Sequence, residues 1–270
     1  MPWLRFDSLV NARDLGGTPT ADGGRIRDGV LLRSDNLQEL TEADLAQLRE
    51  LGLTDVLDLR SNYEVAQEGP GPITREPGVT VRRFTYLPES DTTPLPDDDP
   101  ADVSGASAGS GVAEQALPWV GLTPSVGHDN VFASHYLSYL ADRPDQVIGA
   151  LRAIAEAEGT VLVHCAAGKD RTGTTVALAL MLVGADEDAV VADYAASSER
   201  MQQIVDRLAS SETYRANLEG RPLSSHLTNP ESMRAFLDHL IGEYGSIEAA
   251  LGRLGWTAAD TERLRAKLLD

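Results

Sequence analysis

A single cysteine stands six residues before an arginine in the segment His164–Gly173, which reads HCAAGKDRTG. The apolar and β-branched residues 160–163 before it predict a short buried strand. The apolar residues 174–183 after it predict a buried helix that stops at Gly184. Residues 166–171 are therefore expected to form a loop that opens a helix. Such a loop turns backbone N–H groups inward, and the first helical turn adds partial positive charge, so a phosphate dianion fits there.

The side chains of this loop suit nucleophilic phosphate transfer. Cys165, at the floor of the loop, is the candidate nucleophile, because the positive field and the nearby Arg171 favour the thiolate over the thiol. Arg171 is the candidate transition-state clamp, since its planar fork of N–H donors holds two phosphoryl oxygens at once. Thr172 is placed to offer its hydroxyl to the sulfur when water cleaves a phospho-cysteine. Gly168 is expected to adopt a positive φ and to let phosphate oxygens approach closely.

The remaining loop residues are assigned supporting roles. His164 directly precedes the cysteine. Its imidazole is expected to bond to backbone and orient Cys165 rather than to act as a base, because an existing thiolate needs no base. This chemistry requires a sulfur that solvent reaches and that lies close to the guanidinium. A lone buried cysteine is otherwise an inert small hydrophobe, but that alternative explains neither the arginine nor the glycine. The residues expected to bind phosphate are Ala166, Ala167, Gly168, Lys169, Asp170 and Arg171.

The motif HCxxGKDRTG resembles the phosphate-binding loop of the cysteine-based tyrosine and phosphoinositide phosphatases, in the variant of a bacterial branch with Lys and Asp before the Arg. Further similarity extends over most of the chain. Asn11–Gly17 (NARDLGG) is similar to the N-terminal motif of that branch, and Leu31–Ser34 (LLRS) to the strand that follows it. Residues 58–64 (DLRSNYE) resemble its D-L-R-S-x-x-E segment, and residues 233–251 resemble its closing helices.

The resemblance implies a phosphatase that needs no metal or other cofactor. Its substrates would be phosphorylated proteins or phosphoinositides: phosphotyrosine first, with phosphoserine, phosphothreonine and phosphoinositides as further substrates. The resemblance implies the same roles for Cys165 and Arg171, and it makes Lys169 an extra positive group that favours multiply phosphorylated substrates. It also implies a helical lid at about residues 189–218, although the spacing of apolar residues there fits a docked pair of core helices equally well.

The general acid is open between two aspartates. Asp170 lies in the loop beside Arg171, is able to protonate the leaving oxygen there, and is the first choice. Asp58, at the end of a predicted strand, is the reserve, and the resemblance supports it as a contender. The alternative for Asp58 is a structural ion-pair cluster with Arg60 and Glu64, which stand four residues apart as helical partners would.

Two segments outside the loop are expected to support it or to lie apart from it. Asn11–Gly17 is expected to brace the loop rather than to contact substrate, with Gly16 and Gly17 in a turn and Arg13 and Asp14 in a local ion pair. Residues 88–118 contain an acidic run and a Gly/Ser-rich run and too few large apolar groups to pack. They are expected to form a flexible surface insertion, with a flap over the active site as the alternative.

Length and composition indicate a single large α/β domain over residues 1–270. The 42% hydrophobic and 24% charged residues are an ordinary soluble composition. Strands are expected at 55–59 and 79–86, and helices at 41–51, 144–157, 230–243 and 257–269. This order of strands and helices predicts a mainly parallel central sheet flanked by helices, followed by a helical C-terminal part.

Charge and targeting signals restrict the partners. The formal net charge of −19 disfavours nucleic acid and anionic membranes, and it argues somewhat against a lipid substrate. Screening limits the reach of remote carboxylates to about 8 Å at physiological salt, so a local phosphate pocket is still compatible with that charge. No apolar run reaches the ~18 residues that stable membrane insertion needs. The N-terminus lacks the features of a secretory signal and the lone cysteine suits a reducing compartment, so we expect a cytoplasmic protein, with signal-less export left open.

Two other functions use loops of this type. A sulfurtransferase also works through a loop cysteine, although the lysine, arginine and threonine here suit phosphate better. A non-catalytic phosphate-recognition module would bind phosphate without turnover, although the loop lacks nothing that catalysis needs. The residues do not indicate an oligomeric state.

Overall fold

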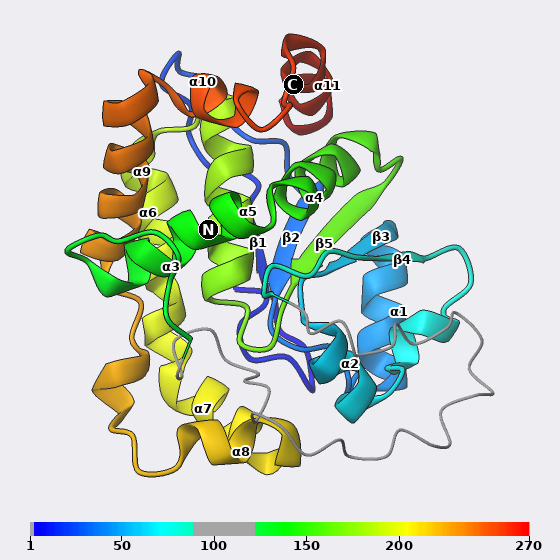
Figure 1. Cartoon of the computed structure of the whole chain (residues 1–270). Coiled ribbons are helices and arrows are strands. Elements are labelled where there is room, and N and C mark those ends of the chain that lie inside the picture. Colours follow the sequence, from blue (N-terminus) through cyan, green and yellow to red (C-terminus); the bar gives the residue numbers. More distant parts are fainter. Residues whose placement is uncertain (1–2, 89–121, 270) are drawn as a thin grey trace.

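The structure is a computed structural model that describes residues 3–88 and 122–269. The expected insertion at 88–118 lies, apart from its first residue, outside the described residues. The strands are β1 (Arg13–Asp14), β2 (Leu31–Ser34), β3 (Leu53–Asp58), β4 (Thr80–Arg83) and β5 (Thr160–His164). The helices are α1 (Glu42–Glu50), α2 (Asn62–Glu68), α3 (Val131–Asp142), α4 (Pro144–Glu156), α5 (Asp170–Leu182), α6 (Glu187–Ala196), α7 (Met201–Ser210), α8 (Glu212–Leu218), α9 (Pro230–Tyr244), α10 (Ile247–Gly252) and α11 (Ala258–Leu268), with 3-10 turns at Pro72–Arg75, Ser197–Arg200 and Leu223–His226 (Figure 1).

The described strands form one mainly parallel sheet, as the sequence predicts. Their order is β1-β2-β5-β3-β4, and only the edge pair β1–β2 is antiparallel. The central strand β5 is buried along its whole length. Such a strand needs apolar side chains on both faces, which is why its sequence is a continuous apolar run rather than an alternating one.

The carboxyl ends of three neighbouring strands meet at one edge of the sheet. In the register of the sheet, His164 at the end of β5 pairs with Ser34 at the end of β2 and with Asp58 at the end of β3. Open α/β sheets bind their ligands outside this edge, where loops leave the strands. The cysteine that follows His164 therefore lies where the fold places a site.

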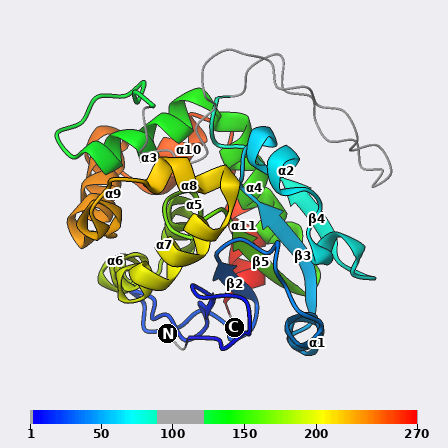
Figure 2. The same ribbon diagram turned by 90° about the horizontal axis from the view of Figure 1, so that it is seen from below.

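Helices cover both faces of the sheet and enclose separate apolar cores. On one face, the apolar side chains of β5 and β3 pack against α4, α5 and the C-terminal helices α9, α10 and α11. On the other face, α1 and the N-terminal segment cover Leu32, Val56 and Leu162. A third, smaller cluster joins α7 and α8 to the loop after β5. Seen from below, these two helices lie in front of α5 (Figure 2).

Capping residues fix the helix starts that the sequence predicts. Thr41 and Thr257 each form a capping box with the aspartate three residues on, at the starts of α1 and α11. The strand predicted at 79–86 is shorter and ends at Arg83. None of the described helices is long and apolar enough to cross a membrane.

Candidate active site

The loop after β5 has the predicted form, with one correction to the start of the helix. The sequence predicts a loop through residue 171, but α5 begins at Asp170, with Lys169 as its N-cap residue. Asp170 and Arg171 therefore lie in the first helical turn, which is the positive end of the helix dipole. The buried interior of α5 continues to Leu182, in agreement with the predicted apolar run.

Three consecutive carbonyls of the loop face away from its interior. Their partners are the amide of Asn36 for Ala166 (3.0 Å), the side-chain amide of Asn11 for Ala167 (2.8 Å) and the guanidinium of Arg33 for Gly168 (2.6 Å). In a planar trans peptide, the carbonyl and the following N–H point in opposite directions. The amides of residues 167–169 therefore face the interior of the loop, where an anion would lie.

Gly168 is required by the fold of the loop. Its φ is +65°, which side chains rarely tolerate, as the sequence predicts. A Cβ at this position would also lie 2.4 Å from the carbonyl oxygen of Ser34, at the end of β2. The close approach that the glycine permits in this structure is therefore to the neighbouring strand end.

Arg171 is held by a carboxylate whose position is fixed locally. Its guanidinium donates to both oxygens of Glu64, at 2.5 and 3.0 Å, and to the carbonyl of Leu59 at 3.1 Å. Glu64 also closes a capping box with Ser61 at the start of α2. Burial opposes the charge of Arg171, but Glu64 and then Cys165 outweigh it and raise the pKa of the guanidinium. Cys165 therefore lies within electrostatic range of Arg171.

The sulfur is less accessible than the chemistry requires. Cys165 is 2% exposed and Arg171 is 1% exposed. The two alanines after the cysteine pack against Met201 and other apolar residues of α7 and against Tyr214 of α8. The expectation of an open path to the thiol is therefore wrong for this conformation, because apolar side chains of two helices cover the loop.

Asp58 lies in an ion pair, as the structural alternative for this residue anticipates. Arg60 donates to both of its oxygens, at 2.9 Å from Nε and 2.7 Å from a terminal nitrogen. Burial opposes ionisation, but Arg60 outweighs it and holds the pKa of Asp58 well below its usual range. Glu64 does not complete this pair as a helical partner of Arg60, because its carboxylate is bound to Arg171.

His164 contacts the cysteine backbone and faces Asp58. Its Nδ1 lies 3.3 Å from the carbonyl oxygen of Cys165, which is the predicted contact with backbone, and its Nε2 lies 3.7 Å from the Asp58 carboxylate. Burial lowers the pKa of His164 to about 4. The imidazole is therefore neutral at physiological pH.

Lys169 and Thr172 are both buried in the loop. The ammonium of Lys169 donates to the carbonyl of His226 at 2.5 Å and lies 3.7 Å from Oδ2 of Asp170. Burial lowers the pKa of this lysine, and Asp170 partly offsets the effect. The hydroxyl of Thr172 is fully buried and makes no hydrogen bond within the described part of the chain.

Asp170 receives a hydrogen bond from outside the loop. Tyr136 of α3 donates to its Oδ1 at 2.7 Å, and the hydroxyl of Tyr194 of α6 lies 2.6 Å from that of Tyr136. Within residues 3–88 and 122–269, Oδ2 of Asp170 has no hydrogen-bond partner. The sequence analysis did not assign either tyrosine to Asp170, because a contact between residues so far apart in the chain depends on tertiary packing.

The N-terminal motif braces the loop, but through a different ion pair from the one expected. Arg13 and Arg33 both bind the buried carboxylate of Asp193 in α6. Asp14 instead accepts the backbone amides of Gly16 and Gly29, each at 2.9 Å. The predicted local pair Arg13–Asp14 is therefore wrong. Arg33 and Asp193 each stand in an otherwise apolar segment. This pattern indicates that each charge has a buried partner, but it does not identify the partner.

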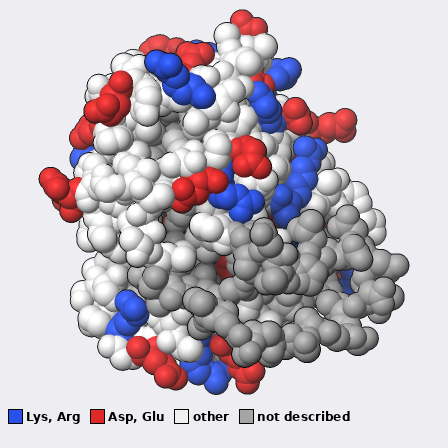
Figure 3. Space-filling model, viewed as in Figure 1, with Lys and Arg blue, Asp and Glu red and all other residues white. Residues whose placement is uncertain are grey.

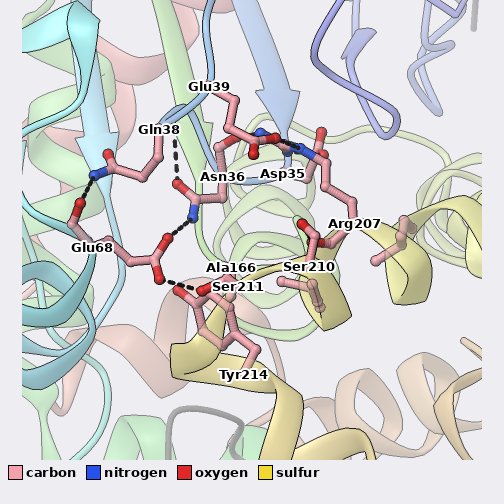
Figure 4. A pocket seen from close by; sticks show the side chains of 12 residues that line it. Asp35, Asn36, Gln38, Glu39, Glu68, Ala166, Arg207, Ser210, Ser211 and Tyr214 are labelled. Carbon is pink, nitrogen blue, oxygen red and sulfur yellow. Dashed lines mark hydrogen bonds and ion pairs between the residues drawn. The ribbon is translucent and has the colours of Figure 1, made fainter.

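Polar contacts hold α7 and α8 over the loop beside a small pocket (Figure 4). Arg207 of α7 binds the carboxylate of Asp35 and donates to the carbonyl of Asn36 at 2.6 Å. Ser211, before α8, donates to Glu68 at 2.5 Å. Tyr214 of α8 donates to Glu64 at 3.2 Å. In contrast to α6, these two helices meet the rest of the protein through a few side chains and a small apolar cluster.

No group of three or more His, Cys, Asp and Glu residues suited to a metal ion occurs among the described residues. The site is instead built from one thiol, inward amides and paired ions. These are the parts that a sulfur nucleophile and a bound phosphate need.

Comparison with known proteins also indicates a phosphatase. The model of the tyrosine phosphatase family matches residues 4–270. The chain is 32% identical to the triple specificity protein phosphatase PtpB of Mycobacterium tuberculosis over 96% of each chain. It is 32% identical to a putative tyrosine-protein phosphatase of Cupriavidus necator, over 74% of this chain and 64% of that protein. It is 25% identical to a tyrosine-protein phosphatase of Nostoc commune, over 93% of this chain and 78% of that protein. The chain therefore belongs to the tyrosine phosphatase family, and it is a hydrolytic, cysteine-dependent phosphatase.

Proposed function

We propose that this phosphatase removes phosphate from tyrosine residues of phosphorylated proteins through a phospho-cysteine intermediate. The observation that carries the proposal is the orientation of the loop, whose carbonyls at residues 166–168 are held outward so that its amides face inward. An oxyanion placed there would meet N–H donors without any rearrangement of the backbone. Cys165 lies at the start of this loop and Arg171 in the helical turn at its end.

The proposed reaction has two steps on one sulfur. The thiolate of Cys165 attacks phosphorus, the bond from phosphorus to the leaving oxygen breaks, and the leaving oxygen takes a proton. Water then attacks phosphorus and the thiolate leaves. Arg171 binds phosphoryl oxygens through both steps, with Glu64 fixing the plane of its guanidinium. The hydroxyl of Thr172 has no hydrogen-bond partner among the described residues, which supports its role as a donor to the departing sulfur.

We assign the general acid to Asp170 and leave Asp58 out of the proton transfer. The reserve candidate is held ionised by Arg60, since its pKa lies well below the usual range, and an ionised carboxylate has no proton to give. Asp170 has one oxygen without a hydrogen-bond partner within the described residues and stands next to Arg171. Its position beside Arg171 and this oxygen support the choice of Asp170.

The substrate range is proposed to include phosphoserine, phosphothreonine and phosphoinositides. The relative from M. tuberculosis carries the name triple specificity phosphatase, which supports activity on more than one phosphorylated group. Surface charge weighs against membrane-bound lipids. The net charge is −19, and on the face shown in Figure 3 basic side chains are interspersed with acidic ones. We therefore expect water-soluble phosphoinositides to be better substrates than the same head groups in an anionic bilayer.

Lys169 is proposed to contact a second phosphate of multiply phosphorylated substrates. In this conformation its ammonium is bound to the carbonyl of His226, so that contact has to be exchanged for the substrate. The phosphate offers a full negative charge in place of a carbonyl dipole, which favours the exchange.

We propose that α7 and α8 form a lid, narrower than the segment 189–218 expected from the sequence. Cys165 is 2% exposed, so substrate needs a movement of whatever covers the loop. The ion pairs of Asp193 with two arginines tie α6 to the sheet, which makes it a poor moving part. The 3-10 turn Ser197–Arg200 between α6 and α7 is the natural hinge.

Phosphate release from a panel of substrates tests the proposed function. Phosphotyrosine and phosphoserine peptides and a soluble phosphoinositide are compared for wild type and Cys165→Ser. We expect wild-type turnover and loss of turnover in the variant, which still binds the phosphopeptide, because a serine hydroxyl is scarcely ionised at neutral pH. Tight binding by wild type without phosphate release would instead indicate a recognition module.

A further inference from the structure

Asp170, the proposed general acid, belongs to a chain of hydrogen bonds that joins three helices, α6, α3 and α5. Tyr136 donates to Oδ1 of Asp170, so its oxygen is free to accept, and the hydroxyl of Tyr194 at 2.6 Å is the donor that this leaves. The chain therefore runs from Tyr194 through Tyr136 to Asp170. All three side chains are nearly or fully buried, with exposed fractions of 2%, 0% and 2%.

Packing fixes both phenols in place. The rings of Tyr136 and Tyr194 meet edge to face, with their centroids 6.0 Å apart. Gly173 in α5 permits this arrangement, because a Cβ there would lie 2.9 Å from the ring of Tyr194. The ring of Phe236 in α9 also meets that of Tyr136 edge to face, with the centroids 5.9 Å apart. The hydroxyls therefore cannot turn to other partners without repacking the core.

Both phenols remain protonated, and therefore remain hydrogen-bond donors, at physiological pH. Burial raises the pKa of Tyr136 and of Tyr194 well above the ordinary value for tyrosine. Loss of either proton would leave an uncompensated charge in the core. The direction of the chain, toward the carboxyl group, is for this reason permanent.

We propose that Tyr136 and Tyr194 are positioning residues that commit Oδ1 of Asp170 to accepting a hydrogen bond, so that Oδ2 carries the proton for the leaving group. The inference rests on the proposed function. Oδ2 is buried and has no hydrogen-bond partner in the described part of the chain, and the ammonium of Lys169 lies 3.7 Å from it. A carboxyl group whose Oδ1 accepts from a phenol favours its proton on the other oxygen, because a carbonyl oxygen is a better acceptor than a hydroxyl oxygen.

Protons and electrons balance in both steps. When the sulfur–phosphorus bond forms, the leaving oxygen keeps the electron pair of the bond that breaks and takes the proton from Oδ2. Asp170 is then a carboxylate whose Oδ1 still accepts from Tyr136. In the second step, water gives its proton to Oδ2 and its oxygen to phosphorus, the sulfur leaves as thiolate, and hydrogen phosphate forms. Tyr136 transfers no proton in either step.

Substrates that differ in leaving group separate positioning from general damage. p-Nitrophenyl phosphate has a leaving group that departs without help, whereas phenyl phosphate and phosphoserine need protonation. We expect Tyr136→Phe to lower kcat for the poorer leaving groups about tenfold with little change in KM, and to change kcat for p-nitrophenyl phosphate less than about twofold. Tyr194→Phe should give the same selectivity with a smaller loss, since it acts through Tyr136.

Tyr86→Phe is the matched control. Tyr86 is an equally buried tyrosine that bonds to the hydroxyl of Thr175 at 2.8 Å and stands outside the chain to Asp170. The substitution removes the same kind of hydrogen bond from the same core. It should leave unchanged the ratio of kcat for phenyl phosphate to kcat for p-nitrophenyl phosphate. If Tyr136→Phe does not fold, Tyr194→Phe decides the question with the same pair of substrates.

The double variant Asp170→Asn/Tyr136→Phe completes the test. If Tyr136 acts through Asp170, its substitution costs nothing further once the acid is gone. Equal losses on both substrates, or a tenfold loss that persists beside Asp170→Asn, overturn the inference. The proposed function fails separately, when wild type releases no phosphate or Cys165→Ser equals wild type.

Discussion

The guanidinium of Arg171 donates to both carboxylate oxygens of Glu64, at 2.5 and 3.0 Å, and both side chains are at most 1% exposed. Burying one of these charges alone is costly, so each depends on the other. Because Tyr214 of α8 donates to the same carboxylate, the pair also joins the loop after β5 to α8. In the proposed mechanism, Glu64 therefore links the phosphate-binding arginine to the proposed lid.

Removing the charge of Glu64 should affect both stability and activity. We expect Glu64→Gln to lower the free energy of unfolding by about 3 kcal/mol, because it leaves Arg171 buried without a counter-charge. We expect kcat/KM for p-nitrophenyl phosphate to fall at least tenfold as the guanidinium loses its fixed plane. Urea unfolding and steady-state kinetics measure the two effects. Glu76→Gln is the control, since solvent screens its pairing with half-exposed Arg49 and the loss of that pair should change stability little.

The close approach at Gly168 predicts a difference between two glycines with positive φ. Gly168→Ala adds the cost of φ +65° and a clash of its Cβ with the backbone of Ser34. Gly78→Ala, at φ +80° with open space around the Cβ, adds only the backbone cost of about 1–2 kcal/mol. Thermal unfolding should show the larger loss for Gly168→Ala, together with weaker inhibition by inorganic phosphate. Equal losses would mean that β2 yields freely.

The contacts of Arg207 predict how the lid responds to proteolysis. Arg207→Ala removes the ion pair with Asp35, so α7 and α8 should open more often and chymotrypsin should cleave residues 201–218 several-fold faster. Orthovanadate in the phosphate loop should slow the cleavage. Arg215→Ala is the control, because the bonds of Arg215 within residues 3–88 and 122–269 go to carbonyls of the adjoining segment, those of Ala209 and Ser210. Cleavage that neither the substitution nor orthovanadate alters would contradict a moving lid.

His164 predicts a loss of stability in mild acid. Its pKa is about 4 in the folded protein against an ordinary value near 6.5, so only the unfolded chain binds this proton between those pH values. The stabilisation is complete above pH ~6.5 and falls as pH drops toward 4, by roughly 3 kcal/mol. Burial lowers the pKa of His135 and His226 too, with the same sign. The comparison of wild type with His164→Gln in urea at several pH values isolates the contribution of His164, since the variant should show the shallower slope.

The continuous part of the site could be predicted from the sequence, and the assembled part could not. The segment His164–Gly173 contains strand end, loop and helix start in one run, so local patterns were sufficient for it. Arg33 and Asp193 are 160 residues apart in the chain, and only the folded sheet brings them together. Their charges in apolar segments signal buried partners, but the choice between Asp193 and Asp14 for Arg13 depends on tertiary packing.

The same limit explains why neither the burial of Cys165 nor the extent of the proposed lid could be predicted from the sequence. An apolar helical pattern predicts that α6, α7 and α8 bury one face, but not which of them is tied to the sheet by buried ions. The pattern likewise does not reveal that Ala166 and Ala167 are covered by α7 and α8. By contrast, the alternating strand and helix signals predict the mainly parallel sheet directly, and the structure confirms it.

Direct detection of a phosphorylated Cys165 tests the central claim. Wild type and Asp170→Asn are mixed with p-nitrophenyl phosphate, quenched in acid within the first turnovers, digested and analysed by mass spectrometry. We predict a phosphate group on the peptide that contains Cys165, with an equal burst of p-nitrophenolate, and neither in Cys165→Ser. Sustained turnover by wild type with phosphate never found on Cys165, and with Cys165→Ser as active as wild type, would contradict the account.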